Sequence, residues 1–237
     1  MFGFGTSLAS VYDYIYMWKD YHKEAHRIVE NLRAVGCADG LLLELACGTG
    51  RHLEHFTNYE KIGVDLCEES LMLASFRDPK ANFVCADMRS VHNQICQKID
   101  VLLMLFGAVS YISPEEISSF FGRCVELMND DAVVVLEPWY EDVDEGGFLH
   151  VYDSKDLKIC RLSDVQDVGN QTVMEFAFMI SRAGGHVERL TDKEYLWNHR
   201  LDVLEQQLAN TGLICIRKTA GFTGPKGLWF LKKGRQE

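Results

Sequence analysis

The sequence has no long apolar run and little positive charge. No stretch of its 237 residues approaches the roughly 20 apolar residues that a membrane-spanning helix needs. Residues 1–7 have no basic region ahead of an apolar core, so we do not expect a secretory signal. Twenty-four basic residues stand against 35 acidic ones, a formal net charge of −11, and a small basic cluster (Lys232, Lys233, Arg235) lies near the C-terminus. A nucleic-acid partner, which typically needs a basic face, and a membrane partner are therefore not expected.

Metal-binding and disulfide patterns are also missing. The eight cysteines include no Cys-x-x-Cys pair, and the eight histidines form no cluster with metal-ligand spacing. Scattered cysteines within apolar segments are typical of small buried residues in a reduced protein. The sequence therefore predicts a cytoplasmic protein with no metal and no disulfide framework. Its length and its 47% apolar content fit one large α/β domain, or one domain carrying an insertion.

An apolar run at residues 41–46, interrupted only by Glu44, leads directly into Gly48 and Gly50. This pattern predicts a strand that is buried on both faces and turns sharply into a helix. Glycines at such a turn allow a ligand to approach the backbone closely, because they carry no Cβ. A plain glycine turn between any strand and helix is the alternative.

Two more expected strands end on acids. Residues 61–66 carry Asp65 at their carboxyl end, where a carboxylate can accept hydrogen bonds from both hydroxyls of a ribose. Residues 81–87 close on Asp87, which could accept from the exocyclic amine of adenine while Leu66 and Met88 pack against the ring. The three strand ends together suit an adenosine.

Strands and helices alternate through the first part of the chain and antiparallel strands follow. We expect core strands at 41–46, 61–66, 81–87, 100–106 and 132–138, and helices within 10–33, 51–57, 68–76 and 114–128, the last capped by Ser113 with Pro114 in its first turn. Antiparallel strands at 158–164, 172–181 and 186–196, with a hairpin at Gly184-Gly185, precede a helix at 200–211 and strands at 213–218 and 227–232. The predicted fold is α/β: a Rossmann-like parallel sheet with helices on both faces and an antiparallel β layer inserted after the fifth core strand.

The glycine turn, with Asp65 and then Asp87-Met88, resembles the cofactor site of class I S-adenosylmethionine-dependent methyltransferases. No third glycine follows Gly50 at the offset of a dinucleotide-binding turn, which favours S-adenosylmethionine over NAD. The resemblance implies cofactor contacts from Tyr21, Glu44, Ala46, Gly48, Gly50, Asp65, Leu66, Asp87, Met88 and Met104. The segment after the fourth strand has no Asn-Pro-Pro-Tyr, Asp-Pro-Pro-Tyr or Pro-Cys signature of DNA methyltransferases, so the acceptor is expected to be a small molecule.

A closer resemblance spans almost the whole chain. Several motifs resemble those of the N-methyltransferases that dimethylate TDP-linked amino-deoxysugars for macrolide antibiotics. They are Tyr12-Asp13-x-x-Tyr16 with Lys19-Asp20-Tyr21, the segment 47–56, Glu137-Pro138-Trp139-Tyr140 and Arg161-Leu162-Ser163. The resemblance implies that Tyr16 and Tyr111 flank the reacting amine, and that the sugar nucleotide is bordered by Glu137, Trp139, Arg161 and Lys226. It also implies three regions: a cofactor-binding core with a helical lid at 1–139, an acceptor-side β insertion at 140–197, and a C-terminal part at 198–237 that completes the sheet.

The acceptor side departs from that family at two places. Asp164 stands where the family has histidine, and would repel a pyrophosphate if it pointed inward; Pro225-Lys226-Gly227 replaces a Gly-Arg-Gly, so Lys226 could meet a phosphate only as a point charge. A hydroxyl or carboxylate acceptor is therefore an alternative, in which Tyr111 would matter more for deprotonation. A non-catalytic partner subunit that keeps the cofactor fold is a second alternative. Some relatives assemble as dimers, so a homodimer is also an expectation.

Overall fold

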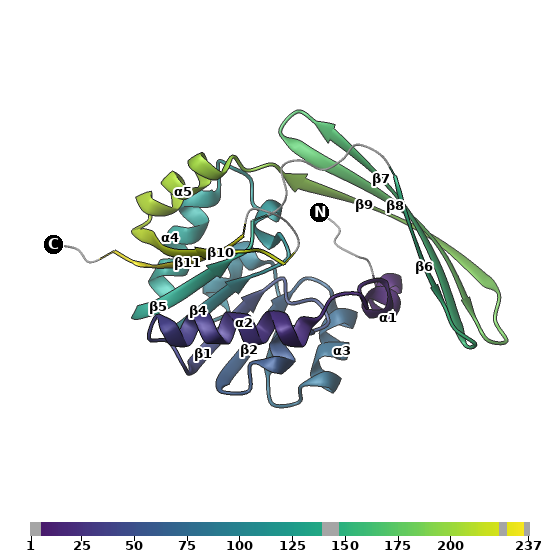
Figure 1. Cartoon of the computed structure of the whole chain (residues 1–237), viewed down its shortest axis with the longest axis horizontal. Coiled ribbons are helices and arrows are strands. Elements are labelled where there is room, and N and C mark those ends of the chain that lie inside the picture. The colour runs from purple at the N-terminus through teal and green to yellow at the C-terminus, as the bar shows by residue number, and fades with distance from the viewer. Residues whose placement is uncertain (1–5, 139–146, 223–226, 235–237) are drawn as a thin grey trace.

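The computed structural model describes residues 6–138, 147–222 and 227–234, which form two β-sheets and the helices that pack against them (Figure 1). The larger sheet has seven strands in the order β10-β11-β5-β4-β1-β2-β3. Strands β1 to β5 pair in parallel, whereas β11 is antiparallel to both β5 and β10. The strands are β1 (Gly40–Leu45), β2 (Tyr59–Asp65), β3 (Asn82–Cys85), β4 (Ile99–Met104), β5 (Met128–Leu136), β10 (Leu213–Thr219) and β11 (Leu228–Lys233).

Helices cover both faces of this sheet, which explains why its strands are apolar throughout. On one face, α2 (Tyr21–Ala34) and the 3₁₀ turn η1 (Leu53–His55) pack on residues such as Leu42. On the other face, Leu43 packs in a cluster with residues of α4 (Ile117–Leu127), α5 (Leu201–Asn210) and the 3₁₀ helix η2 (Met88–Asn93). Successive strand residues point to opposite faces, so both leucines are buried, as expected for a parallel sheet.

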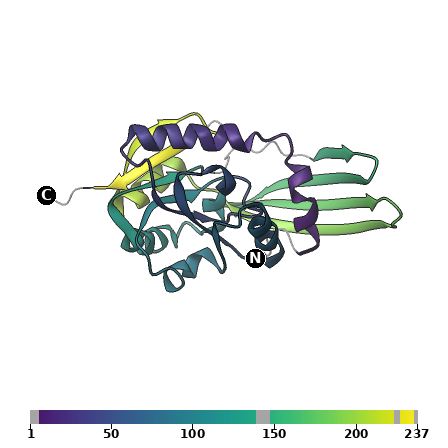
Figure 2. The ribbon, with the colours of Figure 1, turned by 90° about the horizontal axis from the view of Figure 1, so that it is seen from below.

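The second sheet is antiparallel and lies beside the first, with strands in the order β6-β7-β8-β9 (Figures 1 and 2). Alternate residues, among them Ile159, Phe176 and Phe178, are buried against α1 (Thr6–Ile15), while their neighbours face outward. The predicted insertion after the fifth core strand is thus confirmed. Its strands are β6 (Phe148–Asp153), β7 (Leu157–Val168), β8 (Gln171–Arg182) and β9 (Val187–Trp197), with the glycine hairpin between the last two.

Three helix expectations were wrong in their limits. The helices expected within 10–33 extend beyond that range, because α1 begins at Thr6 and α2 ends at Ala34; the Asp20 carboxylate caps α2 by accepting the Lys23 N–H at 3.0 Å. The expected helix at 51–57 is a single 3₁₀ turn. The helix expected at 114–128 begins at Ile117, since the segment before it is a turn closed by a 2.9 Å hydrogen bond from the Glu116 N–H to the Ser113 carbonyl.

Across the three described ranges, no helix combines the length and the apolar character needed to cross a bilayer. The same residues contain no group of three or more histidine, cysteine, aspartate or glutamate side chains that could hold a metal ion.

Candidate active site

A cavity of about 440 Å³ lies between the carboxyl ends of the core strands and the buried face of the four-stranded sheet. This volume is within the range of small-molecule sites. Six of the residues expected to contact the cofactor line it: Ala46, Gly48, Asp65, Leu66, Asp87 and Met88. Both tyrosines expected at the acceptor, Tyr16 and Tyr111, line the same cavity. A single space therefore brings the strand-end acids and the acceptor-side phenols together.

The glycine turn exposes its backbone to this cavity. Gly48 has φ +53°, and a Cβ built on it would meet no atom within 4 Å, so the turn leaves room for a ligand against the main chain. Gly50 has another role: with φ +72°, its missing Cβ would lie 3.0 Å from the Cβ of Ala74 in α3 (Glu68–Arg77). Gly50 thus permits close packing of the turn on α3 and does not line the cavity.

Asp65 joins the glycine turn to the end of β2. Its Oδ2 accepts the Gly48 N–H at 2.8 Å, and its Oδ1 accepts the Cys67 N–H at 2.9 Å. Burial raises the pKa of Asp65, although these backbone hydrogen bonds partly oppose the shift. Each carboxylate oxygen has a second lone pair, so both can still accept a ribose hydroxyl.

Asp87 is held by Arg89 at the end of β3. The Arg89 Nε and Nη2 atoms lie 2.9 and 2.6 Å from the Asp87 carboxylate, which also accepts the Arg89 N–H at 2.9 Å. Burial pushes the pKa of Asp87 up, but the hydrogen bonds from Arg89 outweigh it and the pKa is lowered. Asp87 therefore remains an ionised acceptor at the cavity wall.

The remaining expected cofactor residues lie elsewhere. Tyr21 and Glu44 line a smaller neighbouring cavity of about 40 Å³, together with Arg51. Burial, with the Asp65 charge as a second cause, raises the pKa of Glu44 to about 8. Met104 is fully buried in the core and lines neither cavity.

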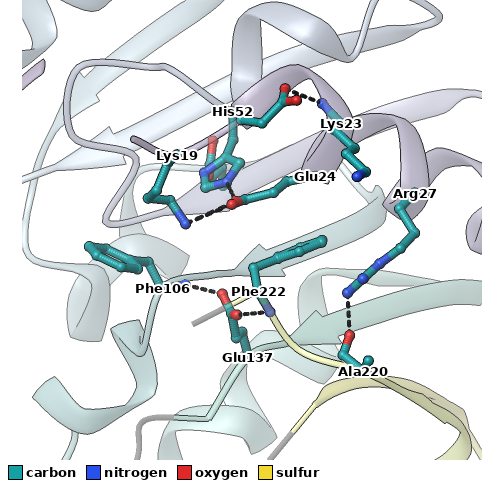
Figure 3. A network of polar contacts seen from close by, with 11 residues as sticks. Lys19, Lys23, Glu24, Arg27, His52, Phe106, Glu137, Ala220 and Phe222 are labelled. Atoms are coloured by element: carbon teal, nitrogen blue, oxygen red, sulfur yellow. Dashed lines mark hydrogen bonds and ion pairs between the residues drawn. The ribbon is translucent and has the colours of Figure 1, made fainter. Parts of the chain in front are cut away.

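A buried ionic network lies beside the smaller cavity (Figure 3). Glu24 accepts a hydrogen bond from Lys19 Nζ at 3.0 Å and is 2.7 Å from His52 Nε2. Lys19 Nζ also lies 4.6 Å from the ring centroid of Phe106, a residue of the main cavity wall. The spacing of these residues gives no sequence pattern, and the network was not expected.

Helix α1 is anchored to the glycine turn by Asp13. Thr49 Oγ1 donates to Asp13 Oδ1 at 2.6 Å, and Arg77 Nη2 of α3 donates to Asp13 Oδ2 at 2.5 Å. The same helix carries Tyr12, which lines the cavity wall. This anchor holds α1, with Tyr12, at the cavity wall.

Where the cavity meets the inserted sheet, the Tyr111 hydroxyl donates to Glu194 Oε1 at 3.3 Å, and Arg161 Nη1 donates to the Tyr16 hydroxyl at 3.2 Å. Burial is the main cause that raises the pKa of both phenols; Arg161 opposes the shift at Tyr16, and Glu194 adds to it at Tyr111. Both phenols therefore stay protonated at neutral pH. Arg161 is buried behind Tyr16 and does not line the cavity.

Glu137, expected to border the sugar nucleotide, is bound to the backbone instead (Figure 3). Its Oε2 accepts the Phe106 N–H at 2.8 Å and its Oε1 accepts the Phe222 N–H at 2.9 Å. It is 1% exposed and does not line the cavity. Trp139 and Lys226, the other two residues expected at the sugar nucleotide, lie outside the described residues.

The cavity residues that were not expected from the sequence include Phe106, Met174, Phe176 and Glu194. Three of these four belong to the inserted sheet, where residue i and residue i+2 share a face. The inward residues of β9 include Asp192, Glu194 and Leu196, and its outward residues include Lys193 and Tyr195. Both faces mix polar and apolar residues, so the pattern of β9 could not identify Glu194 as inward.

The strand order separates this fold from dinucleotide-binding proteins. Those proteins have six parallel strands in the order 3-2-1-4-5-6. Here the first five strands follow the same order, but the next strand, β11, is antiparallel to β5 and pairs with β10 at the edge of the sheet. With a backbone-lined turn and two strand-end acids in one cavity, the fold and the site define a class I S-adenosylmethionine-dependent methyltransferase. Gly48, Asp65 and Asp87 would hold the cofactor.

Comparison with known proteins gives the family. Residues 42–131 match the family described as "Methyltransferase domain". The chain is 33% identical, over 78% of its length and 80% of the relative's, to the dTDP-3-amino-3,4,6-trideoxy-alpha-D-glucopyranose N,N-dimethyltransferase of Streptomyces venezuelae. The chain therefore belongs to the family of S-adenosylmethionine-dependent methyltransferases that includes this dTDP-amino-sugar N,N-dimethyltransferase.

Solved structures show the same fold over nearly the whole chain. The crystal structure of DesVI from Streptomyces venezuelae superposes with a TM-score of 0.85 at 29% identity and covers 95% of this chain and 98% of its own. The structure of CalS10 with bound S-adenosylmethionine, from Micromonospora echinaspora, has a TM-score of 0.80 at 24% identity and covers 98% of each chain. The match includes the inserted sheet as well as the core.

Replacing Asp13 by alanine is expected to weaken donor binding about tenfold, which corresponds to about 1.4 kcal/mol. The variant loses the hydrogen bond from the Thr49 hydroxyl and the ion pair with Arg77, which together hold α1 on the glycine turn. Solvent partly screens the ion pair because its side chains are not fully buried, so the expected effect is moderate. Calorimetric titration with S-adenosylhomocysteine measures the change. Asp202→Ala, which removes an exposed ion pair with Arg200, is the matched control and should leave the affinity unchanged. An Asp13→Ala affinity equal to that of the control would contradict the anchor.

Proposed function

We propose that this methyltransferase acts on the amino group of a nucleotide-linked amino sugar. The observation that carries the proposal is the single cavity shared by the strand-end acids and by Tyr16, Tyr111 and Glu194, because donor and acceptor must meet in one enclosed space. The name of the Streptomyces venezuelae relative, a dTDP-amino-sugar N,N-dimethyltransferase, supports the choice of acceptor.

The residues of the chain would act mainly by placement. Bound S-adenosylmethionine supplies an electrophilic methyl group, to which the nitrogen lone pair forms a bond as the carbon–sulfur bond breaks with its electron pair going to sulfur. Holding the reactants in contact accounts for roughly 7–11 kcal/mol of barrier in favourable cases. The aromatic walls formed by Tyr12, Tyr16 and Phe106 exclude water and attract a cationic donor through their ring faces.

The inserted sheet supports a sugar-nucleotide acceptor in spite of the Asp164 departure. Arg161 and Ser163 point to the buried face of β7, whereas Leu162 and Asp164 are exposed on the opposite face. Asp164 is further occupied by Gln166, whose Nε2 donates to it at 2.8 Å. The charge that would repel a pyrophosphate is therefore directed away from the cavity.

The test is mass spectrometry of the purified protein with S-adenosylmethionine and a panel of dTDP-amino-deoxyhexoses. We expect a methylated amino sugar and S-adenosylhomocysteine, because the cavity presents its acids and phenols to one acceptor position. The matched controls are panel members with a hydroxyl in place of the amine. Methylation of these controls instead would move the acceptor to oxygen. Donor binding without turnover of any member would overturn the sugar acceptor while leaving the fold and the cofactor intact.

The proposal includes a small-molecule acceptor rather than nucleic acid or a membrane, and a cytoplasmic setting. A homodimer belongs to the same set of expectations, and sedimentation of the purified chain tests it.

A further inference from the structure

Glu194 is a buried carboxylate that faces the acceptor end of the cavity. Its residue is 6% exposed, and it lies on the inward face of β9, between Asp192 and Leu196 on the same face. Tyr111, from the 3₁₀ helix η3 (Ala108–Tyr111), donates to its Oε1 at 3.3 Å. The directly opposed residue on β8 is Met174, which is apolar. The carboxylate is thus fixed in position by one phenol and enclosed by apolar side chains.

Few positive charges compensate this carboxylate. Among the described residues, the cation that acts on Glu194 is Arg161, and its guanidinium is engaged by the Tyr16 hydroxyl at 3.2 Å and by the rings of Tyr16 and Phe176. The titratable or charged groups around Glu194 are Tyr12 from α1, Tyr16 directly after α1, Tyr111 from η3, Arg161 from β7 and Asp192 from β9. Glu194 thus has a second acid, Asp192, nearby, and the cation that acts on it, Arg161, already contacts other groups. A buried carboxylate in these surroundings is suited to bind a cationic ligand.

We propose that Glu194 binds the ammonium group of the acceptor and takes its proton before methyl transfer, while Tyr111 positions the carboxylate. This inference rests on the proposed amino-sugar acceptor. An alkylammonium is the form that a sugar amine takes near neutral pH, and it has no free electron pair for attack. Proton removal by a placed carboxylate therefore solves a problem that placement alone does not.

The proton and electron balance is simple. One N–H bond of the ammonium breaks and its electron pair stays on nitrogen, while the proton bonds to a Glu194 oxygen. The resulting amine forms the new carbon–nitrogen bond and becomes a methylammonium. Glu194 then releases its proton to solvent and can accept another if the same nitrogen is methylated a second time.

The pKa of the carboxyl suits this role. Burial is the largest cause that raises the pKa of Glu194 to about 7; Asp192 adds to the rise, and the Tyr111 hydrogen bond and Arg161 oppose it. A base with a pKa near the operating pH is the most effective. The rate should therefore fall below about pH 7, as Glu194 becomes protonated and loses its attraction for the ammonium.

The test is Glu194→Gln, assayed with the best amino sugar of the panel from pH 6 to 9. We expect kcat/KM to fall about 100-fold at pH 7, the lower range for loss of an acid–base group. The deficit should shrink as pH rises, because the acceptor loses its proton to solvent. Tyr111→Phe should lower the rate less and should shift the acidic limb to higher pH, since the lost hydrogen bond favours the ionised carboxylate. Glu175→Gln, the same change on the outward face of β8, is the matched control.

A binding measurement provides a readout besides activity. With S-adenosylhomocysteine bound, Glu194→Gln should lose the preference for the amino sugar over its hydroxyl analogue. Glu194→Gln with wild-type affinity and pH profile, or with a deficit equal at every pH, would overturn the inference. A loss of S-adenosylmethionine affinity with unchanged S-adenosylhomocysteine affinity would also overturn it, because Glu194 would then serve the donor's sulfonium. A wild-type enzyme that neither binds nor methylates any amino sugar overturns the proposed function, and this inference with it.

Discussion

Replacing Asp65 by alanine is expected to weaken S-adenosylmethionine binding about 100-fold or more. In the proposed complex the carboxylate accepts two ribose hydroxyl hydrogen bonds, and charge-assisted bonds are worth about 1.5–3 kcal/mol each. The variant also frees the Gly48 and Cys67 N–H groups, which Asp65 now holds at 2.8 and 2.9 Å. Loss of the ligand contacts and loss of turn geometry act in the same direction.

Isothermal titration with S-adenosylhomocysteine measures this affinity, and thermal melting without ligand reports whether the variant is folded. Asp164→Ala is the control, because that aspartate is exposed on the outer face of β7 and does not line the cavity. Asp87→Ala provides a graded comparison: Asp87 is already bound by Arg89, so less of its acceptor capacity is available to the adenine. A folded Asp65→Ala protein with the affinity of the Asp164→Ala control would remove Asp65 from the donor site.

The core of the fold could be predicted because its strands are continuous apolar segments that can be recognised in the sequence. Residues such as Leu42 and Leu43 are buried on opposite faces, so the run is apolar without alternation and is easy to recognise. Acids at the ends of β2 and β3 lie together because parallel strands end at one edge of the sheet. The expected helix at 51–57 failed for a local reason. The backbone there closes 3₁₀ hydrogen bonds, such as that from the His55 N–H to the His52 carbonyl, and stops after one turn.

The acceptor side could be predicted only in part, because its contacts join segments far apart in the chain. Tyr111 meets Glu194 across 83 residues, and Arg161 meets Tyr16 across 145. No periodicity within either segment encodes such pairs. The resemblance placed Tyr16 and Tyr111 at the amine, and both line the cavity, but it gave no position for Glu194.

Glu137 has a role that only the folded chain reveals. Phe106 adopts φ +53°, in the left-handed region that is unfavourable for a residue with a Cβ, and such a backbone persists only when its surroundings hold it. The Glu137 carboxylate binds the Phe106 N–H and, with its other oxygen, the Phe222 N–H. Through Phe106, whose ring centroid is 5.2 Å from that of Tyr16, Glu137 fixes part of the cavity wall.

Glu137→Ala is therefore expected to lower the free energy of unfolding by about 3 kcal/mol. It leaves two buried N–H groups without their acceptor, at about 1–3 kcal/mol each, and relaxation of the Phe106 backbone returns part of that cost. For a chain of this size the melting temperature of the ligand-free protein should fall by about 6–12 °C. Glu137→Gln should lower the free energy of unfolding by about half as much, since its amide keeps one acceptor oxygen.

The matched control is Glu60→Ala, which alters an exposed glutamate on β2 and should melt within a degree or two of the wild type. A direct role in holding the sugar nucleotide gives the opposite pattern. The melting temperature would be unchanged or higher, because removing a buried functional charge often stabilises a protein, and the acceptor KM alone would rise. Melting without ligand thus separates the two roles of Glu137, since backbone support is already present in the free protein and acceptor binding is not.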